Sequence, residues 1–397
     1  MQRRLESALA GARGLFSLSP WERAGVRGLS VRRLLEVRSP PHPNPLPEGE
    51  GTRGSPRQKL RPPGAWPVLL VSVAVCIACI PINALARDGK PIKICYIAKN
   101  TGNPYFDPLI EGMKKAAEEN GAEFSTVAPA TADATSQLPL IKEQVQRGVN
   151  VIAISPNSKD ALNRVFKEAM RKGVTVITVD SDLTGNEQNR DACVLTVDPI
   201  DVGNSQVELL GSLIGYKGKI AILSATADAP NQNAWIKVMK ETLAGDPKYK
   251  EMQLVDVVYG NDEPQKSRTE ADALLIKYPD LRGIIAPTTV GVAACAQAVE
   301  AAKKSDQVQV TGLGTPNQMR RFIKNDTIKA FALWSPYDEG YLAGYVGYLI
   351  ACKKLTPAPG AKFDAGKIGQ RDFREKNVII TGPPVTFTKE NIDKYNF

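Results

Sequence analysis

Polar and aromatic side chains gather where the apolar segments of this sequence end. Residues 99–106 (KNTGNPYF), 155–157, 180–182, 229–235, 287–289 and 333–338 follow such segments and supply amides, carboxylates, one lysine and aromatic rings. Amide and carboxylate groups exchange hydrogen bonds with vicinal hydroxyls, and aromatic faces cover the apolar side of a ring. Because these segments lack arginine clusters, they predict a site for a neutral, hydroxyl-rich small molecule.

Most of these candidate side chains also have a purely structural explanation. Asn103 precedes Pro104, which is the pattern of an N-cap followed by proline at the first helical position. Asn157 and Asp338 are equally compatible with helix caps, and Phe106 with a place in the core. The case for a site therefore rests on the recurrence of amides and aromatic rings at the strand ends of both halves of the chain.

Three charged residues stand out at the same strand ends. Lys99 is as compatible with a surface charge as with a ligand contact. Asp180 and Asp182 flank a serine at the end of an apolar strand, where an unpaired carboxylate has little structural use. We expect this pair of carboxylates to be the strongest single candidates for ligand binding.

Several chemistries are excluded. The one histidine, His42, precedes residue 87, so a chain that begins there has no histidine for a catalytic triad or a metal site. The segment GLGTPN at 312–317 lacks the third glycine of a dinucleotide-binding loop, and neither GxSxG nor GxxxxGK[ST] occurs. We expect no catalytic residue, no metal and no cofactor. Four widely spaced cysteines suit buried thiols: Cys95, Cys193, Cys295 and Cys352.

Residues 1–86 read as a leader. Plausible codons for residues 18–27 (LSPWERAGVR), reverse-complemented, encode PHPSPLPGGE, which matches residues 41–50 (PHPNPLPEGE) at eight of ten positions. We interpret roughly residues 1–55 as a start-site artefact. The basic segment 57–66, the apolar run 67–80 and Ala84-Leu85-Ala86 then predict a secretory signal cleaved before Arg87. A transmembrane anchor, for which the run is short, and a lipoprotein anchor at Cys79 are the alternatives.

The basic charge of the chain comes from this leader. Residues 1–86 hold 12 of the 51 Lys and Arg residues and 5 of the 42 Asp and Glu residues, which leaves 39 against 37 in the remainder. The high isoelectric point is therefore no indication of a nucleic-acid partner, and we expect none.

Alternating strands and helices must position the candidate side chains. Apolar segments such as 92–98 (IKICYIA), 149–155, 174–180, 219–225 and 282–288 alternate with amphipathic segments such as 106–121. This pattern predicts an α/β fold with parallel sheets covered on both faces. About 310 residues exceed one ordinary core, which favours two doubly wound lobes, with a single (β/α)8 barrel as the alternative. Residues 183–191 join two strands without an α-helix, so we expect a sheet edge and a crossing into the second lobe there.

Long motifs in the second half carry a family resemblance. The segments are NQNAWIKVMK (231–240), YPDLRGIIAPTTVG (278–291), VTGLGTPNQMRRFIKN (310–325), FALWSPYDEGYLAGY (331–345) and NIDKYNF (391–397). Along residues 90–397 the chain resembles the sugar-binding, type I class of periplasmic binding proteins for ABC importers. Within that class it is similar to the rhamnose-binding proteins and the autoinducer-2 receptors.

The resemblance implies two lobes joined by a three-strand hinge, with crossings near 196–200, 332–336 and 378–386. The N-terminal lobe would comprise 87–198, completed by about 337–377, and the C-terminal lobe 199–336, completed by 378–397. A ligand would be trapped between the lobes by hinge closure. The expected protein is a periplasmic monomer that delivers a monosaccharide, L-rhamnose before others, to a membrane permease.

The autoinducer-2 receptors share a pattern of Lys, Asp, Asp-Gln, Pro and Ala. Lys99, Gln232 and Pro287 match it here, whereas we place Asn157 and Asn231 at the carboxylate positions and Thr289 at the alanine. These departures favour the rhamnose-type relatives. In such a protein we expect the 6-methyl group of the bound deoxysugar to contact aromatic side chains. The complete predicted site is Lys99, Asn103, Phe106, Asn157, Asp180, Asp182, Asn231, Gln232, Thr289, Trp334 and Asp338.

Two other functions remain open at this point. A sugar-responsive transcription regulator shares the fold, but it would need a helix-turn-helix before Lys90, where the chain has its signal segment instead. A carbohydrate enzyme on a barrel would use Lys99 as a Schiff base and Asp180 or Asp182 as a general base. The absence of histidine after residue 86 speaks against such an enzyme.

Overall fold

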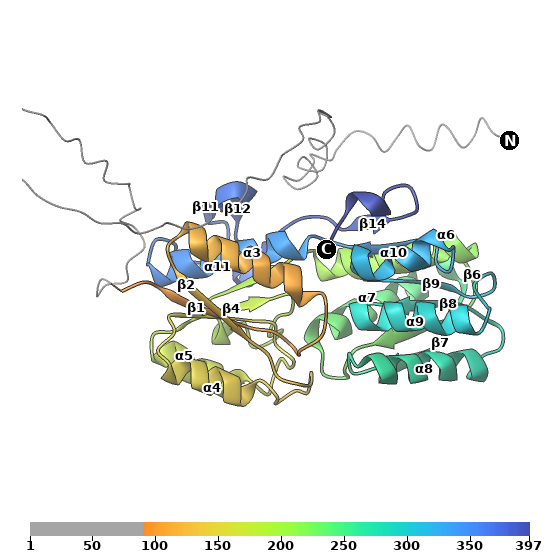
Figure 1. Cartoon of the computed structure of the whole chain (residues 1–397), viewed down its shortest axis with the longest axis horizontal. Coiled ribbons are helices and arrows are strands. Elements are labelled where there is room, and N and C mark those ends of the chain that lie inside the picture. The colour runs from red at the N-terminus through yellow and green to blue at the C-terminus, as the bar shows by residue number, and fades with distance from the viewer. Residues whose placement is uncertain (1–89) are drawn as a thin grey trace, which may run out of the picture. The chain divides into compact units, whose positions relative to one another are not determined.

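The structure, a computed structural model, describes residues 90–397 (Figure 1). The predicted leader, signal segment and cleavage before Arg87 lie outside the described residues. Among residues 90–397, no helix is both long and apolar enough to cross a bilayer.

A six-stranded sheet with the order β13-β5-β4-β3-β1-β2 forms the first lobe. Its strands, all paired in parallel, are β1 (Lys93–Ile97), β2 (Glu123–Val127), β3 (Val151–Ile154), β4 (Thr175–Val179), β5 (Ala192–Leu195) and β13 (Val378–Ile380). Its helices are α3 (Phe106–Glu119), α4 (Leu138–Gln146), α5 (Asn163–Arg171) and α11 (Pro336–Ala351). Since successive side chains of a strand point to opposite faces, Ile94 and Tyr96 pack with α3 and α11, and Cys95 and Ile97 with α4 and α5.

A four-stranded parallel sheet with the order β7-β6-β8-β9 forms the second lobe. Its strands are β6 (Lys217–Ser224), β7 (Glu251–Tyr259), β8 (Leu281–Ala286) and β9 (Gln309–Gly312). Its helices are α6 (Pro199–Ile214), α7 (Pro230–Gly245), α8 (Pro264–Lys277), α9 (Thr289–Ala301) and α10 (Pro316–Lys324). Helix α6 packs with α7, and α8 packs with α9. The predicted α/β class with two parallel sheets is confirmed, and the barrel alternative is wrong because the strands form two separate sheets.

Short elements complete the fold. Two antiparallel pairs join β10 (Phe331–Leu333) to β14 (Val385–Phe387) and β11 (Lys362–Asp364) to β12 (Gln370–Asp372). Single 3₁₀ turns are η2 (Glu187–Asn189), η3 (Pro247–Tyr249), η4 (Gly366–Ile368), η5 (Glu375–Asn377) and η6 (Ile392–Lys394). Cys95, Cys193 and Cys295 are buried free thiols as expected, whereas the free thiol Cys352 is half-buried.

The chain passes between the two sheets three times. It leaves the first sheet after β5, returns after β10 into α11, and leaves again between β13 and β14. The sequence interpretation of β5 as a sheet edge is wrong, because β13 pairs in parallel along its outer side through residues 378–380. This pairing joins segments about 185 residues apart, which local periodicity cannot reveal.

Glycines set the close approach of α3 and α11. A Cβ atom on Gly112 would lie 1.9 Å from the carbonyl oxygen of Tyr337, and one on Gly340 would lie 1.9 Å from that of Leu109. Neither position has room for a side chain. The helix that follows β1 is therefore packed tightly against the helix that follows the second crossing, and both begin beside the candidate site.

Candidate functional site

A small cavity of about 40 Å³ lies between the strand ends of the two lobes. Its first-lobe residues follow β1 and β4, and its second-lobe residues follow β6, β7, β8 and β9, as expected for a ligand site in open parallel sheets. The lining residues are Lys99, Asn103, Tyr105, Phe106, Asp180, Asn231, Gln232, Trp235, Asp262, Pro287, Thr288, Thr289, Leu313, Leu333 and Trp334.

Three buried side chains join the lobes at this cavity. The Lys99 Nζ atom lies 3.0 Å from Asp180 Oδ2 and donates a hydrogen bond of 2.9 Å to Asn231 Oδ1. The Asn231 amide group in turn donates to Asp180 Oδ2 at 3.0 Å. Since Lys99 and Asp180 belong to the first lobe and Asn231 to the second, this triad of mutual contacts spans the cleft. Its one positive and one negative charge balance each other.

The backbone of Asp180 is strained. Its φ of 63° lies in the left-handed region, which a non-glycine residue seldom occupies. Such conformations persist only where the surrounding structure holds them, and they are frequent at functional sites. Here the strain accompanies a carboxylate that faces both Lys99 and Asn231.

A second contact between the lobes runs through Asn103. Its side-chain oxygen accepts hydrogen bonds from the backbone N–H of Tyr105 at 3.0 Å and from the Thr289 hydroxyl at 2.7 Å. Helix α3 begins at Phe106, with Tyr105 at the N-cap position, so Asn103 stabilises the turn before the helix instead of capping the helix itself. The same oxygen thus serves the local turn and the cleft.

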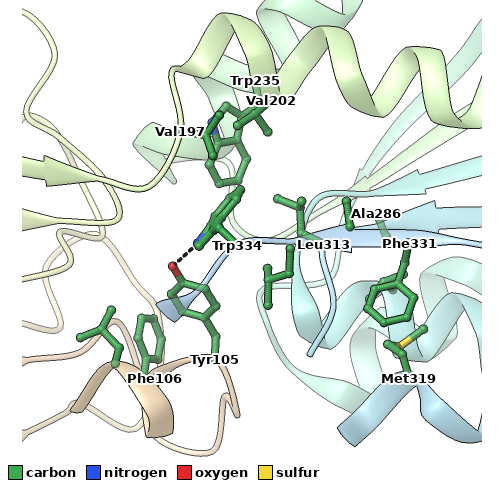
Figure 2. Packing of buried hydrophobic residues seen from close by; sticks show 14 of the residues in the cluster. Tyr105, Phe106, Val197, Val202, Trp235, Ala286, Leu313, Met319, Phe331 and Trp334 are labelled. Carbon is green, nitrogen blue, oxygen red and sulfur yellow. Dashed lines mark hydrogen bonds between the residues drawn. The ribbon is translucent and has the colours of Figure 1, made fainter. Parts of the chain in front are cut away.

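Aromatic rings form one wall of the cavity. Figure 2 shows the indole ring of Trp334 between Trp235 and Tyr105, whose ring centroids lie 5.8 and 6.4 Å away. The Trp334 Nε1 atom donates to the Tyr105 hydroxyl at 2.7 Å, and Phe106 packs edge to face against Tyr105. Such a wall suits the apolar face of a ring-shaped ligand.

Gln232 is fixed through one end of its amide. Its Oε1 atom accepts hydrogen bonds from the Ser224 hydroxyl at 2.7 Å and from the backbone N–H of Ala225 at 2.9 Å. Both contacts lie within the second lobe, and they fix the amide of Gln232 in the cavity that it lines.

Asp262 is a cavity residue that the sequence interpretation missed. It is buried, and its Oδ1 atom accepts a hydrogen bond from the Thr288 hydroxyl. Burial raises the pKa of the Asp262 carboxyl, an effect that the Thr288 hydrogen bond and the charge of Lys99 oppose. Asp262 follows β7, and the strand-end rule applied to residues 252–260 (MQLVDVVYG) could have found it.

Eight of the predicted site residues line the cavity: Lys99, Asn103, Phe106, Asp180, Asn231, Gln232, Thr289 and Trp334. The other three, Asn157, Asp182 and Asp338, do not. The Asn157 amide donates to the backbone oxygen of Lys99 at 2.8 Å, so it supports the lysine without facing the cavity. Asp338 lies half-buried in the first turn of α11, which Ser335 caps by accepting from the Asp338 N–H.

The expectation that Asp180 and Asp182 are unpaired carboxylates is wrong. Asp180 contacts Lys99, as described above. Asp182 accepts two hydrogen bonds, of 2.5 and 2.6 Å, from the guanidinium group of Arg190, whose side chain is 1% exposed. It also accepts from the Thr178 hydroxyl at 2.9 Å. Asp182 therefore stabilises the loop between β4 and β5.

A larger cavity of about 420 Å³ shares Asp180, Asn231 and Trp235 with the first. The contact between Asp180 and Asn231 thus forms part of a wall common to both cavities. Small-molecule sites usually enclose about 300–1,000 Å³, so the 40 Å³ cavity must widen to hold a ligand. Within residues 90–397, no group of three or more His, Cys, Asp or Glu side chains is placed to hold a metal ion.

Comparison with known proteins identifies the family. A family model described as a periplasmic binding protein domain matches residues 94–355. The crystal structure of a sugar ABC transporter protein from Actinomyces odontolyticus is 41% identical, with a TM-score of 0.63 over 77% of this chain and 98% of that one. An ABC transporter solute-binding protein from Clostridium phytofermentas with bound L-rhamnose is 32% identical, with a TM-score of 0.74 and the same coverage.

Among curated relatives, the D-ribose/D-allose-binding protein of Pseudomonas aeruginosa is 25% identical over 66% of this chain and 83% of its own length. These relatives are binding proteins, in agreement with the expectation that this chain is not an enzyme. The chain therefore belongs to the periplasmic binding protein family.

Proposed function

We propose that this chain is the periplasmic substrate-binding component of an ABC sugar importer and that its ligand is L-rhamnose. The triad of Lys99, Asp180 and Asn231 carries this proposal, because it brings donors and acceptors of both lobes together beside an aromatic wall. The family and the sugar-transport relatives support the general role, and the solute-binding protein with bound L-rhamnose supports the choice of sugar.

The chemistry of the cavity suits a neutral sugar. Lys99 and the Asn231 amide can donate to ring hydroxyls, and Asp180 can accept from them. Because the charges of Lys99 and Asp180 balance, the triad itself does not call for a charged ligand. The 6-methyl group of a deoxysugar would contact Trp334 or Phe106, which are both buried in the cavity wall.

Hinge closure would couple ligand binding to the contacts between lobes. A sugar larger than the 40 Å³ cavity must displace some of the bonds that the triad residues make to one another. Its hydroxyls would then bridge the same side chains, so ligand contacts from both lobes would exist only in the closed arrangement. This differential binding would shift the equilibrium between open and closed forms.

The position of Asp180 also favours a second candidate, autoinducer-2. Asp180 contacts Lys99 in the cavity, whereas Asn157, which we had placed at the first carboxylate position of the receptor pattern, lies outside it. If Asp180 holds that position, only Asn231 and Thr289 depart from the pattern. A further pentose or hexose is the third candidate, since a curated relative is named for D-ribose and D-allose.

Tryptophan emission tests the proposal directly, because Trp235 and Trp334 both line the cavity. The protein is unfolded and refolded to remove bound ligand, and L-rhamnose, ribose, glucose, fucose and autoinducer-2 are titrated in parallel. Saturable binding of one molecule of L-rhamnose at micromolar concentration or below, without turnover, is the expected result. Saturation by another compound but not by rhamnose would refute the choice of ligand. No response to any sugar, in emission or calorimetry, would refute sugar binding itself.

A further inference from the structure

Glu339 is a fully buried carboxyl group near the cavity but not in its lining. It lies in the first turn of α11, the helix that follows the second crossing between lobes. Its Oε2 atom accepts a hydrogen bond of 2.6 Å from the Tyr105 hydroxyl, while its Oε1 atom has no hydrogen-bond partner among residues 90–397. A buried carboxyl without a cation bonded to it is costly, so its place in the fold calls for an explanation.

Tyr105 connects this carboxyl to the cavity wall. The Tyr105 hydroxyl donates to Glu339 and accepts from the Trp334 indole N–H at 2.7 Å. Both Tyr105 and Trp334 line the cavity, and Trp334 lies in the crossing between β10 and α11 (Figure 2). Three groups in series, Trp334, Tyr105 and Glu339, therefore link the aromatic wall to the start of α11.

We propose that Glu339 is a positioning residue for the ligand site: it fixes the Tyr105 hydroxyl, which in turn sets the rotation of the Trp334 ring that the ligand contacts. This inference rests on the proposed ligand binding in the cavity. Without the carboxyl, the Tyr105 hydroxyl loses its acceptor, and its orientation is no longer fixed by that hydrogen bond. The indole N–H would then lack a fixed acceptor, and the ring could turn within the wall.

The charged and titratable groups that influence Glu339 indicate which substitution should preserve its role. Burial, and then the negative charge of Asp180, raise the pKa of Glu339, whereas the Tyr105 hydrogen bond and the charge of Lys99 oppose this rise. Tyr96 is a further titratable neighbour, and Glu339 contributes to its raised pKa. A neutral Glu339 would accept from Tyr105 through a carbonyl oxygen. Glutamine offers the same acceptor at the same length, whereas leucine offers none.

The test measures ligand affinity and tryptophan emission for Glu339→Gln, Glu339→Leu, Tyr105→Phe and the double variant Tyr105→Phe/Glu339→Leu. Loss of one hydrogen bond to a buried group should weaken sugar binding about tenfold in Glu339→Leu, and Glu339→Gln should restore it. If Glu339 acts through Tyr105, Glu339→Leu should cost little more once Tyr105 is phenylalanine. Emission should change in Glu339→Leu and Tyr105→Phe but not in Glu339→Gln.

Tyr341→Phe provides a matched control. The Tyr341 hydroxyl donates to Glu119 at 2.6 Å, which is the same kind of bond between the same two helical regions, but neither residue lines the cavity. This variant should lower stability without changing affinity or emission.

Several outcomes would overturn the inference. Equal sugar affinity in wild type and Glu339→Leu would do so while leaving the proposed function intact, and so would additive losses in the double variant. If the wild type binds no sugar, the proposed function fails separately, and the emission of the same variants still decides whether Glu339 orients Trp334. Unchanged emission in both Glu339→Leu and Tyr105→Phe would then reject the inference as well.

Discussion

Asn231→Ala is the substitution that tests the cleft most directly. Asn231 is the second-lobe member of the triad, and its amide both accepts from Lys99 at 2.9 Å and donates to Asp180 at 3.0 Å. Alanine removes both contacts but leaves the first-lobe pair of Lys99 and Asp180 in place. In the ligand-free protein the substitution therefore removes hydrogen bonds between the lobes, and in the complex it removes the ligand bonds that replace them. In neither case does it leave Lys99 or Asp180 without a charged partner.

The expected loss of affinity follows from the two charged partners of Asn231, which are Lys99 and Asp180. A hydrogen bond to a charged group contributes about 1.5–3 kcal/mol net, and part of that loss is recovered when water solvates the exposed partners. We therefore expect Asn231→Ala to weaken sugar binding by about 1–3 kcal/mol, or about 5- to 150-fold. Isothermal titration calorimetry measures this difference, and thermal unfolding verifies that the variant is folded.

Asn233→Ala is the control for that experiment. Asn233 lies two residues further along α7, is exposed, and donates to the backbone oxygen of Ala227 at 2.7 Å. Its removal should leave the affinity unchanged. An Asn231→Ala protein that binds with a dissociation constant within about twofold of wild type would contradict the assignment of the triad as the ligand site.

Three further predictions concern stability and export. Asp182→Ala should lower the free energy of unfolding by about 3–5 kcal/mol, because it leaves Arg190 buried without its carboxylate partner. Urea denaturation measures this loss, and a loss under about 1 kcal/mol, as for an exposed ion pair, would contradict the structural role of Asp182. The pKa of Glu339 is raised above 4.5 in the folded protein, so the folded state keeps this proton to a higher pH than the unfolded state does. The stability that this proton contributes is lost as the pH rises. Wild type should therefore lose stability relative to Glu339→Gln as the pH rises above the ordinary glutamate pKa of 4.5, and a constant difference would refute this. Mass spectrometry of the exported protein should find Arg87 at the N-terminus; an intact cytoplasmic chain beginning at Met1 would refute the signal prediction.

The fold could be predicted in outline because its signals are local. Apolar segments such as 151–154 and 175–179 are fully buried, as parallel strands covered on both faces must be. The position of β13 could not be predicted, since residues 378–380 are a short segment whose pairing with β5 depends on the assembled sheet. Helix α3 also begins later than predicted, at Phe106 and not at Pro104, because Asn103 stabilises the preceding turn.

The sequence could predict which strand ends form the candidate site, but not the direction in which each side chain points. The rule that ligands bind at the carboxyl ends of parallel strands led to Lys99, Asp180 and Asn231, which line the cavity. It could not separate Asp180 from Asp182, because the partner of Asp182 is Arg190, eight residues further on in a loop. Spacing along the chain does not show which of two neighbouring carboxylates turns towards an arginine and which towards the cleft.

The amide at position 231 complements both charged members of the triad. Among the described residues that line the cavity, Lys99 is the only cation, and it contacts both Asp180 and Asn231. An aspartate at 231 would place a second carboxylate about as close to Asp180 Oδ2 as the 3.0 Å that now separates the two side chains, and like charges there would repel each other. Asparagine instead donates to Asp180 while it accepts from Lys99. A ligand that replaces these contacts must therefore offer an acceptor to the Asn231 amide as well as donors to Asp180, and a hydroxyl group can do both.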